Sequence, residues 1–200
     1  MASDRARLTA TEVDSYVQQL SGRLPATPAE EAEFLARLRA WGVADDGRPV
    51  YMLNVMSYYD RLQDVPRGSA ISVTPAESNR IYEDRVTPLL MRLGAYPVVG
   101  GEASGISMSA RHSALTATDT SVDDADRILV VRYPSRRAFF ELISDEAYLP
   151  WAPYKFAALR LALVPVTAQA VVPDPRWIAG ALCLVIFLAA GWWRAARARR

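Results

Sequence analysis

The stretch RILVVRYPSRRAFFELIS, residues 127–144, contains the pattern of a strand, a turn and a helix in immediate succession. Its first seven residues are mostly β-branched or leucine, which is typical of a buried strand. Pro134 ends the strand, and the side chain of Ser135 can cap the first turn of a helix. That helix carries three large apolar residues on one face: Phe139, Leu142 and Ile143. We therefore expect it to fold back and pack on the sheet that contains the strand.

Three more strands are predicted from apolar runs rich in β-branched and aromatic residues. They cover residues 50–57, 95–103 and 161–168. Gly100 and Gly101 weaken the second of these runs, which predicts an edge strand or a bulged strand. Pro165 has no amide hydrogen for the sheet ladder, so the last strand is also predicted to lie at an edge.

A helix is predicted between the first two of these runs. Thr74 and Glu77 have the spacing of a capping box, in which each side chain satisfies a free amide at the helix start. Gly94 is expected to end the helix. Pro88 lies inside it and is expected to kink or split it, because proline removes one helical hydrogen bond.

The order strand, helix, strand, strand, helix, strand over residues 46–168 is the βαββαβ pattern of ferredoxin-like folds. An N-terminal extension, residues 1–45, is predicted to add two helices near residues 11–20 and 29–41. The predicted fold class is therefore α+β, with helices on one face of an antiparallel sheet. The other face needs a cover, and we expect a second copy of the chain to provide it in a homodimer.

The C-terminal part is predicted to be a single transmembrane helix in the cell membrane. After a linker at residues 169–176, residues 177–193 carry no charge, and a basic tail follows at 194–200. A helix of that length measures roughly 25 Å, close to the about 30 Å of a bilayer's hydrocarbon core. The residues expected at the membrane interfaces are tryptophans and arginines: Trp177, Trp192, Trp193, Arg194 and Arg197. The alternative is a buried core helix followed by a basic tail.

The membrane orientation follows from two opposing preferences. Arginines beside a span prefer the cytoplasm, which would place the preceding domain outside. The first 20 residues, however, have no apolar signal core that would start its translocation. We expect a cytoplasmic domain held by a C-terminal anchor.

Composition limits the classes of function. The formal net charge of +1 provides no field that would attract nucleic acid, so no nucleic-acid partner is expected. The single cysteine, Cys183, lies in the apolar tail, which leaves no disulfide pair and no cysteine-based metal cluster. We expect neither a metal nor a cofactor. Lys155 is the only lysine among 23 basic residues, and we attribute this bias to composition rather than to function.

Three segments, residues 48–59, 86–105 and 126–159, resemble the dimeric α/β-barrel domains known as domain of unknown function 1330. The resemblance covers roughly residues 46–168. It implies a homodimer in which two sheets enclose a small barrel, within a superfamily that includes haem-degrading monooxygenases, muconolactone isomerase-like enzymes and members without known activity. The family label therefore implies no reaction.

Five residues are candidates for a ligand pocket or for catalysis: Asn54, Tyr58, His112, Arg132 and Tyr133. Asn54 lies in an apolar strand, where its amide either binds a ligand or satisfies backbone groups, and we favour the second interpretation. Haem-degrading relatives need a histidine on a helix, whereas His112 lies in a Ser/Thr-rich, loop-like stretch. Arg132 and Tyr133 could bind an anionic group near a helix start. The alternative, which we favour, is that Arg132 pairs with an Asp or Glu on a neighbouring strand.

Two functions are compatible with these observations. The favoured one is a membrane-anchored, non-catalytic dimerisation or accessory module, which contacts a second copy, another membrane protein and the lipid bilayer. The alternative is a small-molecule enzyme or binder of monooxygenase or isomerase type that acts on an apolar substrate.

Overall fold

The structure is a computed structural model that describes residues 7–24, 27–63, 73–103, 124–167 and 175–197. The chain forms two compact units, Met1–Thr167 and Ala168–Arg200. The predicted His112 and most of the Ser/Thr-rich stretch around it lie outside the described residues.

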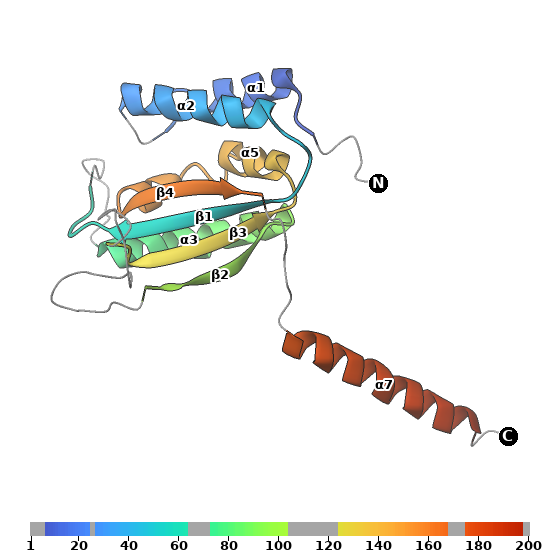
Figure 1. Ribbon diagram of the computed structural model, residues 1–200. Helices are drawn as coiled ribbons and strands as arrows, with labels where there is room; N and C mark the ends of the chain where they lie inside the picture. The colour runs from blue at the N-terminus through green and yellow to red at the C-terminus, as the bar shows by residue number, and fades with distance from the viewer. Residues whose placement is uncertain (1–6, 25–26, 64–72, 104–123, 168–174, 198–200) are drawn as a thin grey trace. The chain divides into compact units, whose positions relative to one another are not determined.

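The first unit is built on a four-stranded sheet with the order β2-β3-β1-β4, in which all neighbouring strands are antiparallel. This is the strand order that the predicted βαββαβ pattern produces, and the α+β fold class is confirmed. The strands are β1 (Val50–Tyr58), β2 (Tyr96–Glu102), β3 (Arg127–Tyr133) and β4 (Leu159–Val166). Helices α3 (Pro75–Arg92), α5 (Arg136–Ser144) and α6 (Ala152–Phe156) accompany the sheet (Figure 1).

Both predicted edge strands are confirmed. β2 lies at one edge, and its pairing with β3 is irregular between Pro97 and Val99. β4 lies at the other edge and pairs only with β1 among the described strands, so Pro165 costs no ladder hydrogen bond there. Pro88 does not split α3, which continues from Pro75 to Arg92 and ends before Gly94, a residue with φ of 71°.

Two more helices, α1 (Ala10–Leu20) and α2 (Pro28–Val43), precede the sheet in the chain. Like α3, each begins with a complete capping box, formed by Thr9 with Glu12 and by Thr27 with Glu30. They pack on the outer side of α5 rather than on the free face of the sheet (Figure 1). Phe140 of α5 is fully buried, and its ring lies 5.9 Å from the Trp41 ring.

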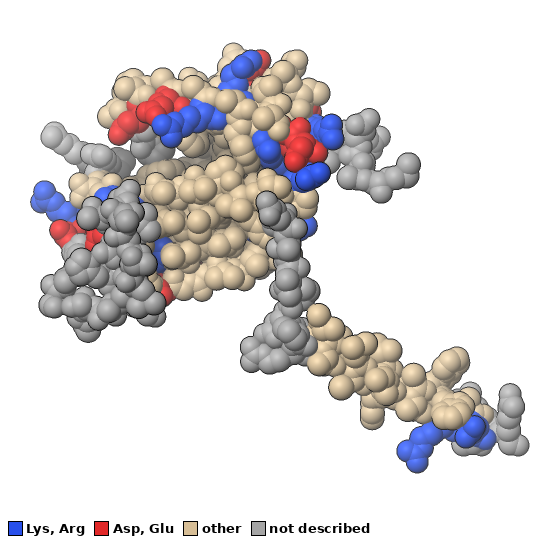
Figure 2. All heavy atoms as spheres, viewed as in Figure 1, with Lys and Arg blue, Asp and Glu red and all other residues tan. Residues whose placement is uncertain are grey.

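The opposite face of the sheet is uncovered by any described element of this unit. Cross-strand partners Leu53, Val130 and Val164 share this face with Ile128 and Val99. Val99, Val164 and Ile128 are 61%, 45% and 40% exposed. Figure 2 shows a broad uncharged surface over these strands, with Lys, Arg, Asp and Glu confined to its margins. The unit therefore has an apolar open sheet face.

The second unit contains α7 (Pro175–Arg197). Its segment Ile178–Arg197 is long and apolar enough to cross a membrane, by length and composition. The guanidinium of Arg197 lies 3.9 Å from the centroid of the Trp193 ring, on the last turn of the helix. Trp192 is exposed, and Arg194 completes the basic end of the helix.

Candidate functional site

A cavity of about 650 Å³ lies between the helix-covered face of the sheet and the helices of the first unit. This volume falls within the range of about 300–1,000 Å³ that is typical of small-molecule sites. Strand residues Met52 and Asn54 line one side, and Tyr82, Glu83, Thr87 and Leu90 of α3 line another. α5 contributes Phe139 and Leu142, α6 contributes Lys155, and α2 contributes Phe34. The leading helices therefore help to form the site.

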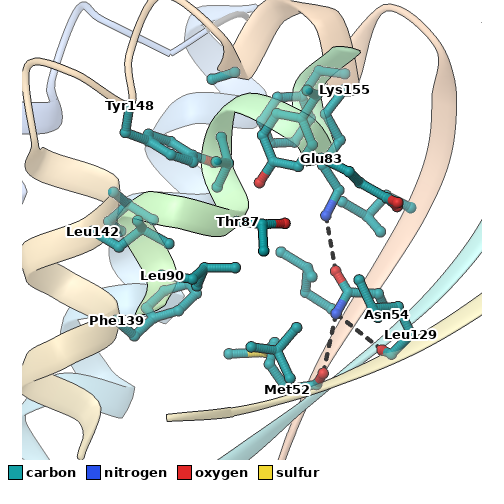
Figure 3. Close-up of a pocket in the computed structure, with 18 of the residues that line it drawn as sticks. Met52, Asn54, Glu83, Thr87, Leu90, Leu129, Phe139, Leu142, Tyr148 and Lys155 are labelled. Atoms are coloured by element: carbon teal, nitrogen blue, oxygen red, sulfur yellow. Dashed lines mark hydrogen bonds between the residues drawn. The ribbon is translucent and has the colours of Figure 1, made fainter. Parts of the chain in front are cut away.

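Asn54 is buried in the middle of β1 and is held by the backbone. Its Nδ2 donates to the carbonyl oxygen of Met52 at 3.0 Å and to that of Leu129 at 3.1 Å. These two bonds fix the amide orientation and leave Oδ1 pointing away from the sheet (Figure 3). The side-chain nitrogen of Asn54 therefore satisfies backbone groups, as expected from the sequence. The side-chain oxygen is directed into the cavity.

The partner of that oxygen is Lys155. Its Nζ donates to Oδ1 of Asn54 at 2.9 Å and lies 5.2 Å from the centroid of the Tyr82 ring. The Lys155 side chain is buried, at 7% exposure. Burial lowers its pKa from 10.5 to about 8, against the opposing effect of the Glu83 charge. A substantial fraction of the amine is therefore neutral near physiological pH.

Lys155 has no ion-pair partner among the residues that the structure describes. The nearest relevant carboxylate, Glu83, is bound elsewhere, since Nη2 of Arg127 donates to its Oε2 at 2.9 Å and Nδ2 of Asn79 donates to its Oε1 at 3.0 Å. Arg127 also donates to Glu102 at 2.7 Å. This network holds the Glu83 carboxylate in place while leaving the lysine amine uncompensated by direct contact.

The two ends of the cavity differ in polarity. Asn54, Glu83 and Lys155 gather at one end, and Thr87 of α3 points its hydroxyl toward the end of the lysine side chain (Figure 3). The other end is lined by apolar side chains, namely Met52, Leu90, Phe139 and Leu142. A molecule that fills the cavity should therefore be apolar along most of its length and polar at one end.

Three tyrosines also line the cavity: Tyr133 and Tyr148, which are buried, and Tyr82, which is partly buried. Burial raises the pKa of each phenol. They are therefore neutral hydrogen-bonding groups at physiological pH. The Tyr82 and Tyr148 rings meet edge to face, with centroids 6.2 Å apart.

The structure brings together only part of the predicted set of site residues. Asn54 and Tyr133 line the cavity, as does Leu129, which pairs with Asn54 across the strands. Arg132 lies on the open sheet face, where its guanidinium lies 5.6 Å from the centroid of the Tyr96 ring. Tyr58 packs on a second small cluster beyond the cavity lining.

Lys155 is the main residue of the site that sequence reasoning missed. A signal was present, because this chain uses arginine for every other basic residue and places its single lysine between Tyr154 and Phe156. We interpreted that bias as compositional. The structure instead puts Lys155 against Asn54, which was a candidate from the outset. Among the described residues, no three His, Cys, Asp or Glu side chains are grouped as metal ligands.

No protein-family model matches the chain, and no curated protein matches it. Two crystal structures of the RPA0582 protein are similar at 24% sequence identity, one of the methylated protein and one described as a protein of unknown function from Rhodopseudomonas palustris. They cover 76% of this chain and 99% and 100% of their own, with TM-scores of 0.52 and 0.53. They show a shared fold.

SnoaB, a cofactor-independent oxygenase from Streptomyces nogalater, is a more distant match at 16% identity, with a TM-score of 0.38. It covers 64% of this chain and 99% of its own. Similarity at this level says nothing about the chemistry of the present site. The shared fold is α+β with a four-stranded antiparallel sheet. The resemblance to the dimeric α/β-barrel domains known as domain of unknown function 1330 stays a prediction.

Proposed function

We propose that the first unit binds a small, mostly apolar molecule whose polar end contacts Lys155. The observation that carries this proposal is the burial of the only lysine of the chain in a cavity of about 650 Å³, with its amine held by Asn54. Burying an amine without an ionic partner costs stability, so a lysine at this position is best explained by a ligand that uses it.

The cavity lining indicates the ligand class. Met52, Leu90, Phe139 and Leu142 provide an apolar surface for a ring or a short chain. The Lys155 amine and the Thr87 hydroxyl provide hydrogen bonds for a carbonyl, hydroxyl or carboxylate group at the other end. A molecule with an apolar body and one polar end would therefore match both the apolar and the polar part of the cavity lining.

Of the two enzyme types considered, the isomerase type fits the residues of the site directly. An amine with a pKa of about 8 can accept a proton from a bound substrate and return it at a different carbon. Asn54 would hold the protonated amine in place through its Oδ1 atom. Ligand binding is the core of the proposal, and proton transfer is the reaction that it makes possible.

The presence of a single lysine gives a direct test of binding. The full chain in lipid nanodiscs, labelled with ¹³C only at Cε of lysine, should give one lysine side-chain signal by NMR. We expect 4-isopropylbenzyl alcohol or 4-isopropylbenzoate to shift this signal in a saturable manner. The variant Thr87→Trp should abolish the shift by filling the cavity, while Met91→Trp, on the exposed side of the same helix, should leave it unchanged. A lysine signal that no such compound moves would refute the proposal.

A second candidate function concerns dimer formation and membrane attachment rather than the cavity. We propose that the protein is a membrane-anchored homodimer in which the open sheet faces of two copies pack together. The supporting observation is the exposure of Val99, Ile128 and Val164 on a face without charged residues near its centre. A second copy offers the same uncharged surface, as an isologous interface requires. This arrangement agrees with an accessory role and is compatible with ligand binding.

The size of the open sheet face is suitable for such a dimer. Four strands of seven to nine residues cover roughly 19 Å by 25 Å. Because side chains project from the sheet, the accessible area of this face is larger than its flat area. It approaches the value of about 800 Å² per partner that is typical of a standard interface. The remaining partner expected from the sequence, another membrane protein, would then contact α7 or the outer helices.

The anchor is tested separately. We propose that α7 crosses the cell membrane, with the tryptophans Trp177, Trp192 and Trp193 near its two interfaces. The full chain should stay in the membrane pellet after alkaline carbonate extraction, and replacing both Leu184 and Ile186 with arginine should release it. Protease treatment of sealed spheroplasts distinguishes a cytoplasmic domain, which we expect, from an external one.

A further inference from the structure

Lys155 differs in kind from every other basic residue of the chain. All 22 others are arginines, and among the described residues none of these is buried. A guanidinium stays protonated at any accessible pH, whereas a buried lysine amine can lose its proton. The only position of the chain that uses lysine is thus a position where a neutral amine can form.

The amine contacts the Tyr82 ring and one neutral hydrogen-bond acceptor. Nζ donates one hydrogen bond, to Asn54, and makes no other hydrogen bond within the described part of the chain. The nearby Glu83 carboxylate is held by Arg127 and Asn79 and does not form an ion pair with the lysine. A neutral amine that donates one N–H to Asn54 keeps its lone pair free for a group inside the cavity.

We propose that Lys155 forms an imine with an aldehyde or ketone bound in this cavity. The inference rests on the proposed function, because the carbonyl compound must first occupy the site. The Nζ lone pair adds to the carbonyl carbon, the C=O π bond breaks, and one amine proton passes to the oxygen. The resulting carbinolamine loses its hydroxyl group with the second amine proton as water, which leaves a C=N bond without any change in oxidation state.

Two features of the cavity favour this reaction. The Thr87 hydroxyl faces the end of Lys155 and can donate to the carbonyl oxygen, which stabilises the negative charge that develops there during addition. The apolar lining from Leu90, Phe139 and Leu142 favours a dry site, in which loss of water is not reversed by bulk solvent. The ligand class is therefore an apolar aldehyde or ketone.

The test compares two lysines in one protein. The variant Arg37→Lys introduces a second amine on α2, at a side chain that is 79% exposed. The full-length variant in lipid nanodiscs is incubated at pH 7.5 with 4-isopropylbenzaldehyde and sodium cyanoborohydride, which reduces the imine to a stable secondary amine. Peptide mass spectrometry then measures the adduct at each lysine and at the N-terminal amine. We expect at least tenfold faster labelling of Lys155 than of the introduced lysine, because an ordinary lysine is almost fully protonated at this pH.

Two controls connect the labelling to the cavity. The alcohol 4-isopropylbenzyl alcohol, which cannot form an imine, should slow labelling of Lys155 and leave labelling at position 37 unchanged. Lys155→Arg keeps a positive charge and should lose the adduct at this position, with Lys155→Met as a second variant. Equal or faster labelling at position 37, or labelling of Lys155 that the alcohol does not slow, overturns the inference.

The alcohol also separates this inference from the function on which it rests. If the alcohol shifts the single lysine NMR signal of the unmodified chain while the aldehyde gives no adduct, the imine proposal is refuted and ligand binding stands. If neither the alcohol nor 4-isopropylbenzoate shifts the lysine signal, and the alcohol does not slow labelling, both proposals are refuted.

Discussion

The side-chain oxygen of Asn54 and the amine of Lys155 lie 2.9 Å apart, although 101 residues separate them in the chain. Asn54 is fixed to the sheet by two backbone carbonyls, so it acts as a rigid acceptor. Lys155 reaches it from α6. A neutral acceptor on a buried amine positions the amine without supplying the negative charge that would keep it protonated.

The first prediction is that the residue at position 54 sets the pKa of Lys155. In an NMR titration of the single labelled lysine, the unmodified chain should titrate near pH 8. Asn54→Asp should raise the midpoint above about 9, because a carboxylate at this distance favours the protonated amine. Asn54→Leu should lower it, because the amine then loses its acceptor.

The other titratable or charged groups that line the cavity are the same in all three proteins: Tyr82 and Glu83 from α3, Arg127 and Tyr133 from β3, Tyr148, and Glu30 and Glu31 near the start of α2. The three proteins therefore differ only in the side chain at position 54, which contacts the amine. One midpoint shared by all three proteins would show that Asn54 and Lys155 are not in contact.

The second prediction is a pH dependence of stability that requires Lys155. The folded protein binds the lysine proton less tightly than the unfolded chain, so the cost of the buried amine is largest below about pH 8 and falls as the pH rises toward 10.5. Between pH 7 and 9.5 this should stabilise the unmodified chain by about 2 kcal/mol relative to Lys155→Met. Chemical unfolding of both proteins in detergent micelles at the two pH values measures the difference. Parallel pH dependences would contradict the lowered pKa.

A third prediction concerns the attachment of the leading helices. A Cβ added to Gly42 of α2 would lie 2.7 Å from Cζ of Phe140 and 3.0 Å from the methyl groups of Val13, and both neighbours are fully buried. Helix propensity alone predicts that Gly42→Ala stabilises the protein by about 1 kcal/mol. We expect the opposite, a loss of about 1–3 kcal/mol in the free energy of unfolding, because neither neighbour has room to move. A gain in stability would show that α2 does not pack closely on α5.

The fold could be predicted because its helix caps and strands are specified by residues that are close together in the sequence. The capping box at Thr74 and Glu77, the serine cap at Ser135 and the strand at residues 127–133 each depend on neighbouring residues, and all three are present in the structure. Pro165 in β4 likewise indicated an edge by its own chemistry. The order of these elements was then sufficient to give the sheet topology.

The site was less predictable because it depends on register and on distant packing. Alternation of side chains along β1 puts Asn54 and Met52 on one face, which the sequence of the strand alone indicates. Which residues of β3 share that face depends on the pairing of Asn54 with Leu129, and this pairing puts Arg132 on the opposite face. Lys155 and the α2 residues that line the cavity come together with Asn54 only through tertiary packing.

The last prediction concerns the open sheet face. If two copies pack through it, a charge near its centre must be buried without a partner in both copies, which costs more than either copy can recover. Ile128→Glu should therefore convert a dimer of the full chain in detergent to a monomer, as measured by sedimentation with the detergent mass matched to solvent density. Val43→Glu is the matched control, since Val43 has a similar exposure of 46% but lies on α2, away from the sheet. Because Ile128 points away from the cavity, the variant should still shift its lysine signal on binding 4-isopropylbenzyl alcohol, which shows that the domain remains folded. A folded Ile128→Glu variant with the sedimentation of the unmodified chain would rule out this face as the interface between copies.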